Sequence, residues 1–251
     1  MKTKVFISGS ISIKKLPNKV KESILKIIDK NLEILVGDAN GIDSLIQDFC
    51  KEKKYFHVTV YTIELLPRYK ADEKFNVIKV NVSNDIKRDR QRQQEKDKQM
   101  TLDSDYSLII WDGKSKGSYS NIIRAIDNNQ KAKVYLTEIN DFLSQNKIKK
   151  EEIEYIYRKN NGYTATEVLN YLQNEIENTF KRTQELNKFL LNKLIIKKEN
   201  NIYLPTEQYQ NLFIIEKYRG KTKGIKFKNE FIAWIENELK SKSQLRQQTL
   251  F

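Results

Sequence analysis

Over its first 140 residues the chain alternates short β-branched runs with stretches of helical periodicity. The strand-like runs are KVFISGS, LEILVGD, HVTVYTI, FNVIKVNV, YSLIIW and KAKVYLTEI. Between them, NKVKESILKIIDK places Val20, Ile24 and Ile27 on one helical face, and GIDSLIQDFCKEKKY and NIIRAIDNN also predict helices. Strands that alternate with helices form mostly parallel sheets covered on both faces. We therefore predict a Rossmann-like α/β domain over residues 1–145 with about six strands.

From residue 150 onward the predicted elements follow a different order. The boundary falls near SQNKIKK, where apolar content drops. KEEIEYIYRKNNG, TATEVLNYLQNEI and KRTQELNKFLLNKLI predict three helices, IIKKENNIYLPT a hairpin, and FKNEFIAWIENEL a closing helix. Three helices followed by a hairpin is the order of a winged helix-turn-helix. We therefore predict a smaller α+β winged-helix domain over residues 150–251.

Composition restricts the chemistry and the location that this chain suits. It has 251 residues with one cysteine and one histidine, which excludes an internal disulfide and any metal site built from several Cys or His residues. No apolar run approaches the roughly 20 residues that cross a bilayer, and the start MKTKVFISGS lacks a signal-peptide core. We expect a cytoplasmic protein with no metal and no membrane partner.

The net charge of +13 is spread over both predicted domains. There are 19 basic and 13 acidic residues from Lys149 onward, and 27 and 20 before it. Such a surface favours polyanionic partners such as nucleic acid or nucleotides, although a lysine-rich composition alone gives the same charge. SNDIKRDRQRQQEKDKQM, between Val82 and Thr101, predicts either an exposed helix or a basic arm that reaches a bound anion or a nucleic-acid backbone.

Three glycine-containing loops follow predicted strands and carry groups that bind phosphate or ribose. The first consists of Ser8, Gly9 and Ser10; its glycine allows backbone N–H groups to approach an anion, and a following helix would add its positive end. The second is GDANGID, whose candidate residues are Gly37, Asp38, Ala39, Asn40, Gly41 and Asp43. There, Asp43 is either a helix N-cap or, like Asp38, a contact to a ribose hydroxyl.

The third loop is WDGKSKGSYSNI, which leaves the run YSLII without a spacer. Its glycines and serines, with Ser118 at the start of the next helix, predict a phosphate cradle, although no Walker motif is present. Ligands of open α/β sheets bind at the carboxyl ends of the strands, so the three loops together predict a nucleotide-type pocket. The candidates of this loop are Asp112, Gly113, Lys114, Ser115, Gly117, Ser118 and Asn121.

KVFISGSISIKKLP, VGDANGID and KDKQMTLDSDYSLIIWDGKSKGSYSNI together resemble a group of bacterial Rossmann-like proteins of the SLOG superfamily, over about residues 1–137. That superfamily includes a DNA-processing protein, Lonely-guy-type nucleotide phosphoribohydrolases and nucleotide-signal sensors. The resemblance implies a nucleotide or nucleotide-derived ligand at the three loops, with no certain cofactor. It adds Lys96, Asp97 and Met100 to the motif, and it implies a homo-oligomer.

The sequence departs from the Lonely-guy-type enzymes at one position. Those enzymes carry a glycine-rich motif that ends in Gly-Thr, two further residues and a catalytic Glu, whereas this chain has GSYSN ending in Asn121. An amide is neither a general acid or base nor an anionic nucleophile, so hydrolysis by that route is not expected. Asp103, Asp105 and Asp112 remain alternative carboxylates, and Asp112 suits a loop-shaping role equally well. The catalytic residues, if any, stay unknown.

The third helix of the C-terminal domain carries side chains that suit DNA. The region resembles winged helix-turn-helix modules and, faintly, the C-terminal domain of phage antirepressors. Phosphates and base edges are contacted by Arg, Lys, Gln and Asn, although small winged-helix folds also serve protein contacts alone. The outward candidates are Lys181, Arg182, Gln184, Lys188 and Asn192, with Lys197 and Lys198 on the wing. KYRGKTKGIKFK is expected to be a glycine-containing loop that forms a second phosphate-contacting patch or a flexible connection.

Together these patterns predict a protein that binds a nucleotide-type ligand through one domain and DNA through the other, as a ligand-responsive regulator. Two alternatives stay open. One is an enzyme, a nucleotide N-glycosidase or deoxyribosyl transferase, whose C-terminal domain serves assembly. The other is a DNA-processing factor that binds single strands through its first domain.

Overall fold

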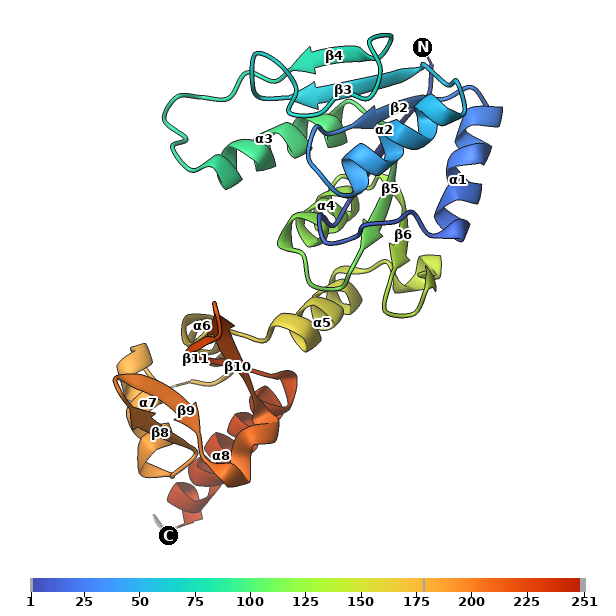
Figure 1. Ribbon diagram of the computed structural model, residues 1–251. Coiled ribbons are helices and arrows are strands. Elements are labelled where there is room, and N and C mark those ends of the chain that lie inside the picture. The colour runs from blue at the N-terminus through green and yellow to red at the C-terminus, as the bar shows by residue number, and fades with distance from the viewer. Residues whose placement is uncertain (1, 178, 249–251) are drawn as a thin grey trace. The chain divides into compact units, whose positions relative to one another are not determined.

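The computed structural model describes residues 2–177 and 179–248 of the chain, which divides into two compact units, Met1–Glu154 and Tyr155–Phe251 (Figure 1). We name them the sheet unit and the C-terminal unit. The division falls inside a helix, α5 (Lys150–Asn161), a few residues beyond the predicted boundary.

A seven-stranded sheet forms the centre of the sheet unit. Its strands are β1 (Lys4–Gly9), β2 (Glu33–Val36), β3 (Val58–Thr62), β4 (Asn76–Lys79), β5 (Tyr106–Trp111), β6 (Lys131–Leu136) and β7 (Asp141–Phe142). They lie in the order β4-β3-β2-β1-β5-β6-β7, and only the β6–β7 pair is antiparallel. The predicted α/β fold with a mostly parallel sheet is therefore confirmed, and the short β7 is an addition that the sequence pattern did not predict.

Helices cover both faces of this sheet, as the alternating pattern predicts. They are α1 (Asn18–Asp29), α2 (Ile42–Glu52), α3 (Asp89–Leu102) and α4 (Lys116–Asp127). Figure 1 shows α1 and α2 on one face and α3 and α4 on the other. On the first face, Val20 and Ile24 of α1 share a core with Val5 and Ile7 of β1. On the second face, Phe6 of β1 packs with Met100 of α3, since successive strand residues point to opposite faces.

The order of the strands reverses between β1 and β5. Chain segments that follow β1 build the sheet toward β4, whereas β5 lies on the other side of β1 and continues toward β7. The carboxyl ends of the two strands lie together, because Gly9 pairs with Ile110. In open α/β sheets a crevice forms at such a switch point, since the connections leave on opposite sides.

The C-terminal unit combines helices with two separate hairpins. Its elements after α5 are α6 (Ala165–Glu175), α7 (Thr183–Asn192), β8 (Ile196–Glu199), β9 (Ile202–Pro205), a 3-10 helix η2 (Glu207–Leu212), β10 (Phe213–Tyr218), β11 (Lys221–Phe227) and α8 (Asn229–Gln248). Its core includes Val168 and Leu172 of α6, Leu186 and Leu190 of α7, and Phe231 of α8. The predicted hairpin β8–β9 and the closing helix are confirmed.

One prediction for the C-terminal unit is wrong. KYRGKTKGIKFK is not a loop, because most of it belongs to the antiparallel hairpin of β10 and β11. Lysines alternate there with residues of strand propensity, and the pairing of Phe213 with Phe227 joins the base of the hairpin to the core. Tyr163 extends this pairing, since its backbone exchanges two hydrogen bonds with Phe227.

Across the described part of the chain, no helix is both long enough and apolar enough to pass through a membrane.

Candidate ligand site at the switch point

A cavity of about 460 Å³ lies at the carboxyl ends of β1 and β5, and we name it the switch-point cavity. This volume is within the range of small-molecule sites. All three predicted loops contribute to its walls. The predicted residues that line it are Ser8, Gly9, Ser10, Ala39, Asp43, Lys96, Asp112, Ser115, Gly117, Ser118 and Asn121.

Other predicted residues do not line this cavity. They are Gly37, Asp38, Asn40, Gly41, Gly113 and Lys114. Two of these glycines have structural reasons to be there. A Cβ on Gly37 would lie 2.3 Å from a carboxyl oxygen of Asp43. Gly41 has a φ of 89°, and a Cβ at that position would lie 2.6 Å from the Cα of Ile11. The packing of the second loop therefore requires glycine at both positions.

Three serine hydroxyls form a cluster on the floor of the cavity. Ser10 Oγ lies 2.7 Å from Ser115 Oγ and 3.3 Å from Ser118 Oγ, and the Ser115 hydroxyl donates to Ser118 at 2.9 Å. This serine cluster joins the loop after β1 to the first turn of α4, whose backbone N–H groups have no partners within the helix. The result is a set of donors that suits an anion.

Two details of the helix positions differ from the sequence prediction. The helix after the first loop, α1, begins only at Asn18, so Ser8–Ser10 do not lie in its N-terminal turn. The positive helix end beside these serines is that of α4, which starts at Lys116 and places Ser118 as its third residue. The helix end beside the first loop therefore comes from α4, which is distant in the chain, and not from the next helix along the chain.

Asp112 shapes the third loop through hydrogen bonds that occupy both of its oxygens. Its Oδ1 accepts from the backbone N–H groups of Ser115 at 2.7 Å and Lys114 at 2.9 Å, and its Oδ2 accepts from the Ser12 hydroxyl at 2.6 Å. Burial alone would raise the pKa of Asp112, but the hydrogen bonds from Ser12 and from those two backbone N–H groups outweigh it and lower the pKa. These contacts account for Asp112 as a loop-shaping residue.

A buried ion cluster supports the cavity wall from behind. Lys96 and Arg68 both donate to Asp38 Oδ1 at 2.7 Å, and Thr62 donates to Oδ2 at 2.9 Å. Burial opposes ionisation of Asp38, but the hydrogen bond from Arg68 and the charge of Lys96 hold the pKa of Asp38 well below its usual range. The ribose contact predicted for Asp38 does not fit this position, because its carboxylate is enclosed by protein donors.

Asp43 is the carboxyl of the second loop that does line the cavity. The N-cap of α2 is Gly41, so the N-cap role considered for Asp43 is wrong; its side chain instead accepts from the backbone N–H of Ala39 at 3.3 Å. Burial raises the pKa of Asp43 to about 7 against the opposing charge of Lys96, and the charge of Asp97 adds to the rise. The cavity therefore holds a carboxyl that exchanges a proton near neutral pH.

Asn121 is held by three neighbours at the same wall. Its amide nitrogen donates to Ser8 Oγ and to Asp97 Oδ2, each at 3.2 Å, and its oxygen accepts from Arg124 at 2.7 Å. Burial raises the pKa of Asp97 against the opposing charges of Lys96 and Arg124. The carboxyl of Asp97 therefore contacts the side-chain amide of Asn121, although residue 121 itself has no titratable group.

The polar stretch SNDIKRDRQRQQEKDKQM before β5 contributes residues to the wall of the switch-point cavity and to the surface of the sheet unit. It folds into α3, where Lys96 and Met100 are buried, although few apolar residues mark an inward face. The sequence motif indicated Asp97 and Met100. The same stretch, predicted to be an exposed helix or a basic arm that reaches a bound anion, is largely helical and supplies four further lining residues, Asp89, Arg90, Gln93 and Gln94. The lining residues that sequence analysis missed are Phe6, Ile11, Ser12, Arg68 and Lys116.

The residues predicted to contact DNA are exposed in the C-terminal unit. Three of them, Gln184, Lys188 and Asn192, belong to α7, whereas Lys181 and Arg182 precede it. The wing candidates lie on β8. There, Lys197 pairs with Glu199 at 2.7 Å and Lys198 lies over the ring of Tyr203.

No protein-family model matches the chain, and no curated protein or solved structure matches it significantly. Its place in the SLOG superfamily therefore stays a prediction from three sequence motifs.

Proposed function

We propose that the sheet unit binds a nucleotide or nucleotide-derived ligand in the switch-point cavity, and that the C-terminal unit binds DNA under the control of that ligand. One observation carries the first half of the proposal. The cavity lies where the strand order reverses, and its floor is the serine cluster at the N-terminus of α4. That combination of place and donors suits a phosphate group.

The remaining lining supports a ligand larger than phosphate. Arg68 and Arg90 provide cations at one side of the cavity, and Phe6 and Met100 provide apolar surface. Asp43 offers a carboxyl that can accept or donate a hydrogen bond to a sugar hydroxyl or a base. Phosphate, sugar and base therefore each have a suitable partner within one cavity of about 460 Å³.

Gly117→Asp is expected to weaken nucleotide binding at least about tenfold, because it places a carboxylate beside the phosphate position. A Cβ at Gly117 meets no atom within 4 Å, so the change fits without repacking. The neutral variant Gly117→Asn, of the same size, is the matched control and should bind like the native chain. Calorimetric titration with nucleoside mono-, di- and triphosphates measures both, after mass spectrometry of any small molecule that co-purifies.

Equal affinity of the Asp and Asn variants would contradict a phosphate position at α4. Failure of the native chain to bind any nucleotide in that panel, with none co-purifying, would contradict the ligand class as a whole.

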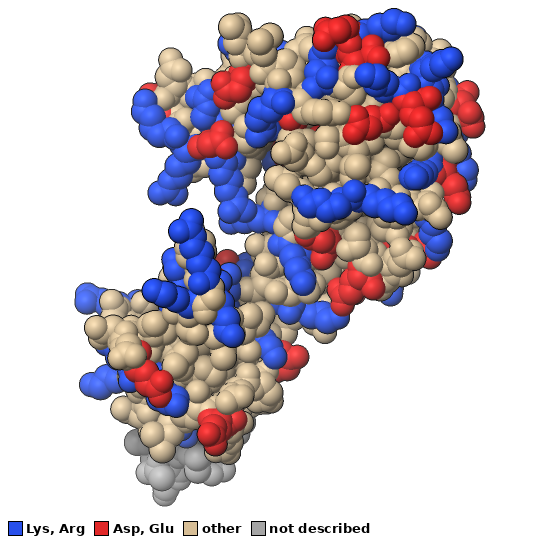
Figure 2. All heavy atoms as spheres, in the orientation of Figure 1, with Lys and Arg blue, Asp and Glu red and all other residues tan. Residues whose placement is uncertain are grey.

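The DNA half of the proposal is supported by the order and surface of the C-terminal unit. The order of the elements α5, α6, α7 and β8–β9 is the order expected for a winged helix-turn-helix. In this proposal α7 is the recognition helix. The second hairpin, β10–β11, departs from the minimal form of that fold. Its free end is exposed and basic, and Figure 2 shows Lys and Arg side chains gathered there. The cations at this end are Lys217, Arg219, Lys221 and Lys223.

Replacing Lys181, Arg182 and Lys188 by alanine is expected to weaken binding of duplex DNA about tenfold or more and to reduce its salt dependence. Each lost phosphate contact lowers the number of counterions that the DNA releases on binding. The matched control is alanine at Lys51, Lys53 and Lys54, which removes the same charge from the sheet unit. Fluorescence anisotropy at several salt concentrations measures both. Equal losses for the two triple variants would show a non-specific charge effect and contradict a recognition surface at α7.

An enzyme is the second candidate, and one observation favours it. Asp43 lines the cavity with a pKa raised to about 7 by burial, which suits a group that transfers a proton. In hydrolysis of an N-glycosidic bond, water would supply the hydroxyl group that replaces the base on the sugar carbon, and the protonated carboxyl would protonate the leaving base and recover its proton from that water. Release of free base from nucleotides, abolished by Asp43→Asn, is the test of this alternative.

A further inference from the structure

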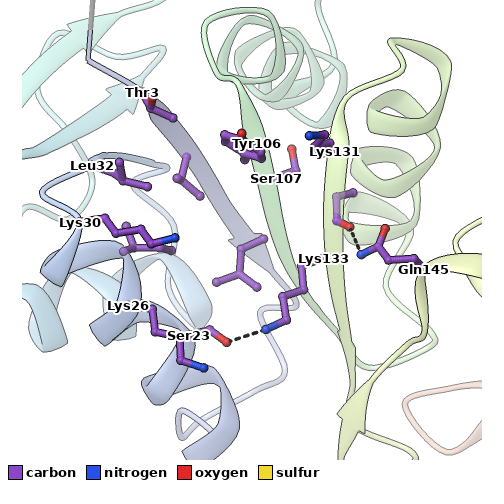
Figure 3. A pocket seen from close by; sticks show the side chains of 14 residues that line it. Thr3, Ser23, Lys26, Lys30, Leu32, Tyr106, Ser107, Lys131, Lys133 and Gln145 are labelled. Carbon is purple, nitrogen blue, oxygen red and sulfur yellow. Dashed lines mark hydrogen bonds between the residues drawn. The ribbon is translucent and has the colours of Figure 1, made fainter.

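A second cavity, of about 530 Å³, lies at the opposite end of the sheet (Figure 3). It is bounded by α1, by the first residues of β1 and β5, and by β6, and it shares no lining residue with the switch-point cavity. We name it the lysine cavity. Its lining residues with polar side chains are Thr3, Ser23, Lys26, Lys30, Tyr106, Ser107, Lys131, Lys133 and Gln145.

Four lysines face this cavity. Lys26 lies in the last turn of α1 and Lys30 is the C-cap residue of that helix, whereas Lys131 and Lys133 lie on the same face of β6 (Figure 3). No Asp or Glu belongs to the described lining. Among the residues that the structure describes, no carboxylate forms an ion pair with any of these lysines. Positive charge is therefore gathered here without a counter-charge.

Lys133 shows the consequence of this crowding. Its amine donates to Ser23 Oγ at 3.1 Å and lies over the ring of Phe142 at 3.9 Å. Burial, and then the charge of Lys26, lower the pKa of Lys133, while Asp141 opposes them. Asp141 is paired with Lys19 at 2.5 Å and does not line the cavity, so it offsets the charge of the lysines only in part. An anion placed between the two lysine pairs would remove this repulsion.

The floor of the lysine cavity is apolar. Val5 and Leu108 of the sheet and Ile27 of α1 form it, and they belong to the main core of the sheet unit or pack against it. Tyr106 stands at one side with 40% of its surface exposed. Val5 and Leu108 are almost fully buried already, so the apolar surface open to the cavity is that of Ile27, Leu32 and Tyr106. An inorganic ion would leave that surface in water, whereas a ligand with an apolar or aromatic body would cover it.

We propose that the lysine cavity binds a small organic anion with more than one phosphate, of the class of nucleoside di- and triphosphates. Its phosphates lie between the lysines of α1 and β6, and its base or other apolar body covers the floor beside Tyr106. Amines on two walls suit a ligand with several negative charges, since a single charge would leave most of them uncompensated. The proposal does not depend on the function proposed for the switch-point cavity.

The test measures ATP binding to the full chain that carries Gly117→Asp, so that the switch-point cavity contributes little. Adding Lys26→Ala and Lys131→Ala is expected to weaken ATP binding at least about tenfold, because each alanine removes a charge-assisted contact. The matched control adds Lys21→Ala and Lys98→Ala, which remove equal charge from α1 and α3 outside the cavity. This control should change the affinity by less than about twofold.

Pyrophosphate and adenosine separate the two parts of the proposed ligand. Each is expected to bind at least about tenfold more weakly than ATP, because each lacks either the apolar body or the charge. Absence of ATP binding, or equal losses for the two double variants, would overturn the site. Pyrophosphate that binds as tightly as ATP would overturn the role of the apolar floor. Because the lysine variants lie outside the switch-point cavity, their failure leaves the Gly117 experiment to be judged separately.

Discussion

Asp38→Ala is expected to lower the free energy of unfolding of the sheet unit by about 3–5 kcal/mol. Asp38 is 1% exposed and Lys96 is 2% exposed, so the substitution removes the carboxylate that accepts a hydrogen bond from the buried Lys96 ammonium. Thr62 and the Arg68 side chain lose the same acceptor. The neighbouring carboxyls of Asp43 and Asp97 replace it poorly, because burial raises the pKa of both. Few single changes cost this much, and an unpaired buried charge is among the mechanisms that do.

Urea denaturation followed by circular dichroism measures this effect, and a second variant isolates its cause. Asp38→Leu combined with Lys96→Met removes both charges and fills the space with apolar groups, so it should recover most of the stability lost in Asp38→Ala. Arg68→Ala is the milder control, because that side chain is 43% exposed and Lys96 still pairs with Asp38. A loss within about 0.5 kcal/mol for Asp38→Ala, the range of ordinary surface changes, would contradict the buried pair.

Asp43→Asn is expected to stabilise the chain by a few kcal/mol at pH 8 and to have little effect at pH 4. Burial raises the pKa of Asp43 from 3.8 to about 7. Below pH 3.8 the carboxyl is protonated in both the folded and the unfolded chain, so it costs nothing. Between about pH 4 and 7 the unfolded chain loses this proton first, and the native protein therefore loses stability as pH rises, at about 1.4 kcal/mol per pKa unit.

The measurement is the melting temperature of both proteins at a series of pH values from 4 to 8. The difference between them should grow steadily across this window and level off above pH 7. A difference that is constant with pH would contradict the raised pKa of Asp43 in the folded protein.

The fold of the sheet unit could be predicted because it depends on local patterns. The strand VTVYT is buried along its whole length, and α1 has a clear apolar face, so a short window of sequence already contains the signal for these elements. α3 is the exception that was hardest to predict. It has almost no apolar stripe, because its inward positions include Lys96, which is buried only through its pair with Asp38, 58 residues away.

The hairpin β10–β11 was missed for a similar reason. The strand β11 carries three lysines and Gly224, and Gly220 lies in the turn before it, so the composition of this stretch is that of a loop. The pairing of the two strands depends on Phe213 and Phe227, which join a core made by helices from elsewhere in the unit. Strand formation is governed by such tertiary neighbours more than by intrinsic preference.

For the candidate sites, the motifs of the chain indicated which loops meet at the carboxyl edge, since parallel strands bring their ends to one side of a sheet. They did not distinguish the roles of Asp38 and Asp43, which differ in the donors that surround them and not in their local sequence. They also gave no sign of the lysine cavity, whose members Lys26 and Lys131 stand far apart in the chain. Periodicity and turn chemistry act over a few residues and are legible in the sequence, whereas burial, pKa and the gathering of charge depend on distances that exist only after the chain has folded.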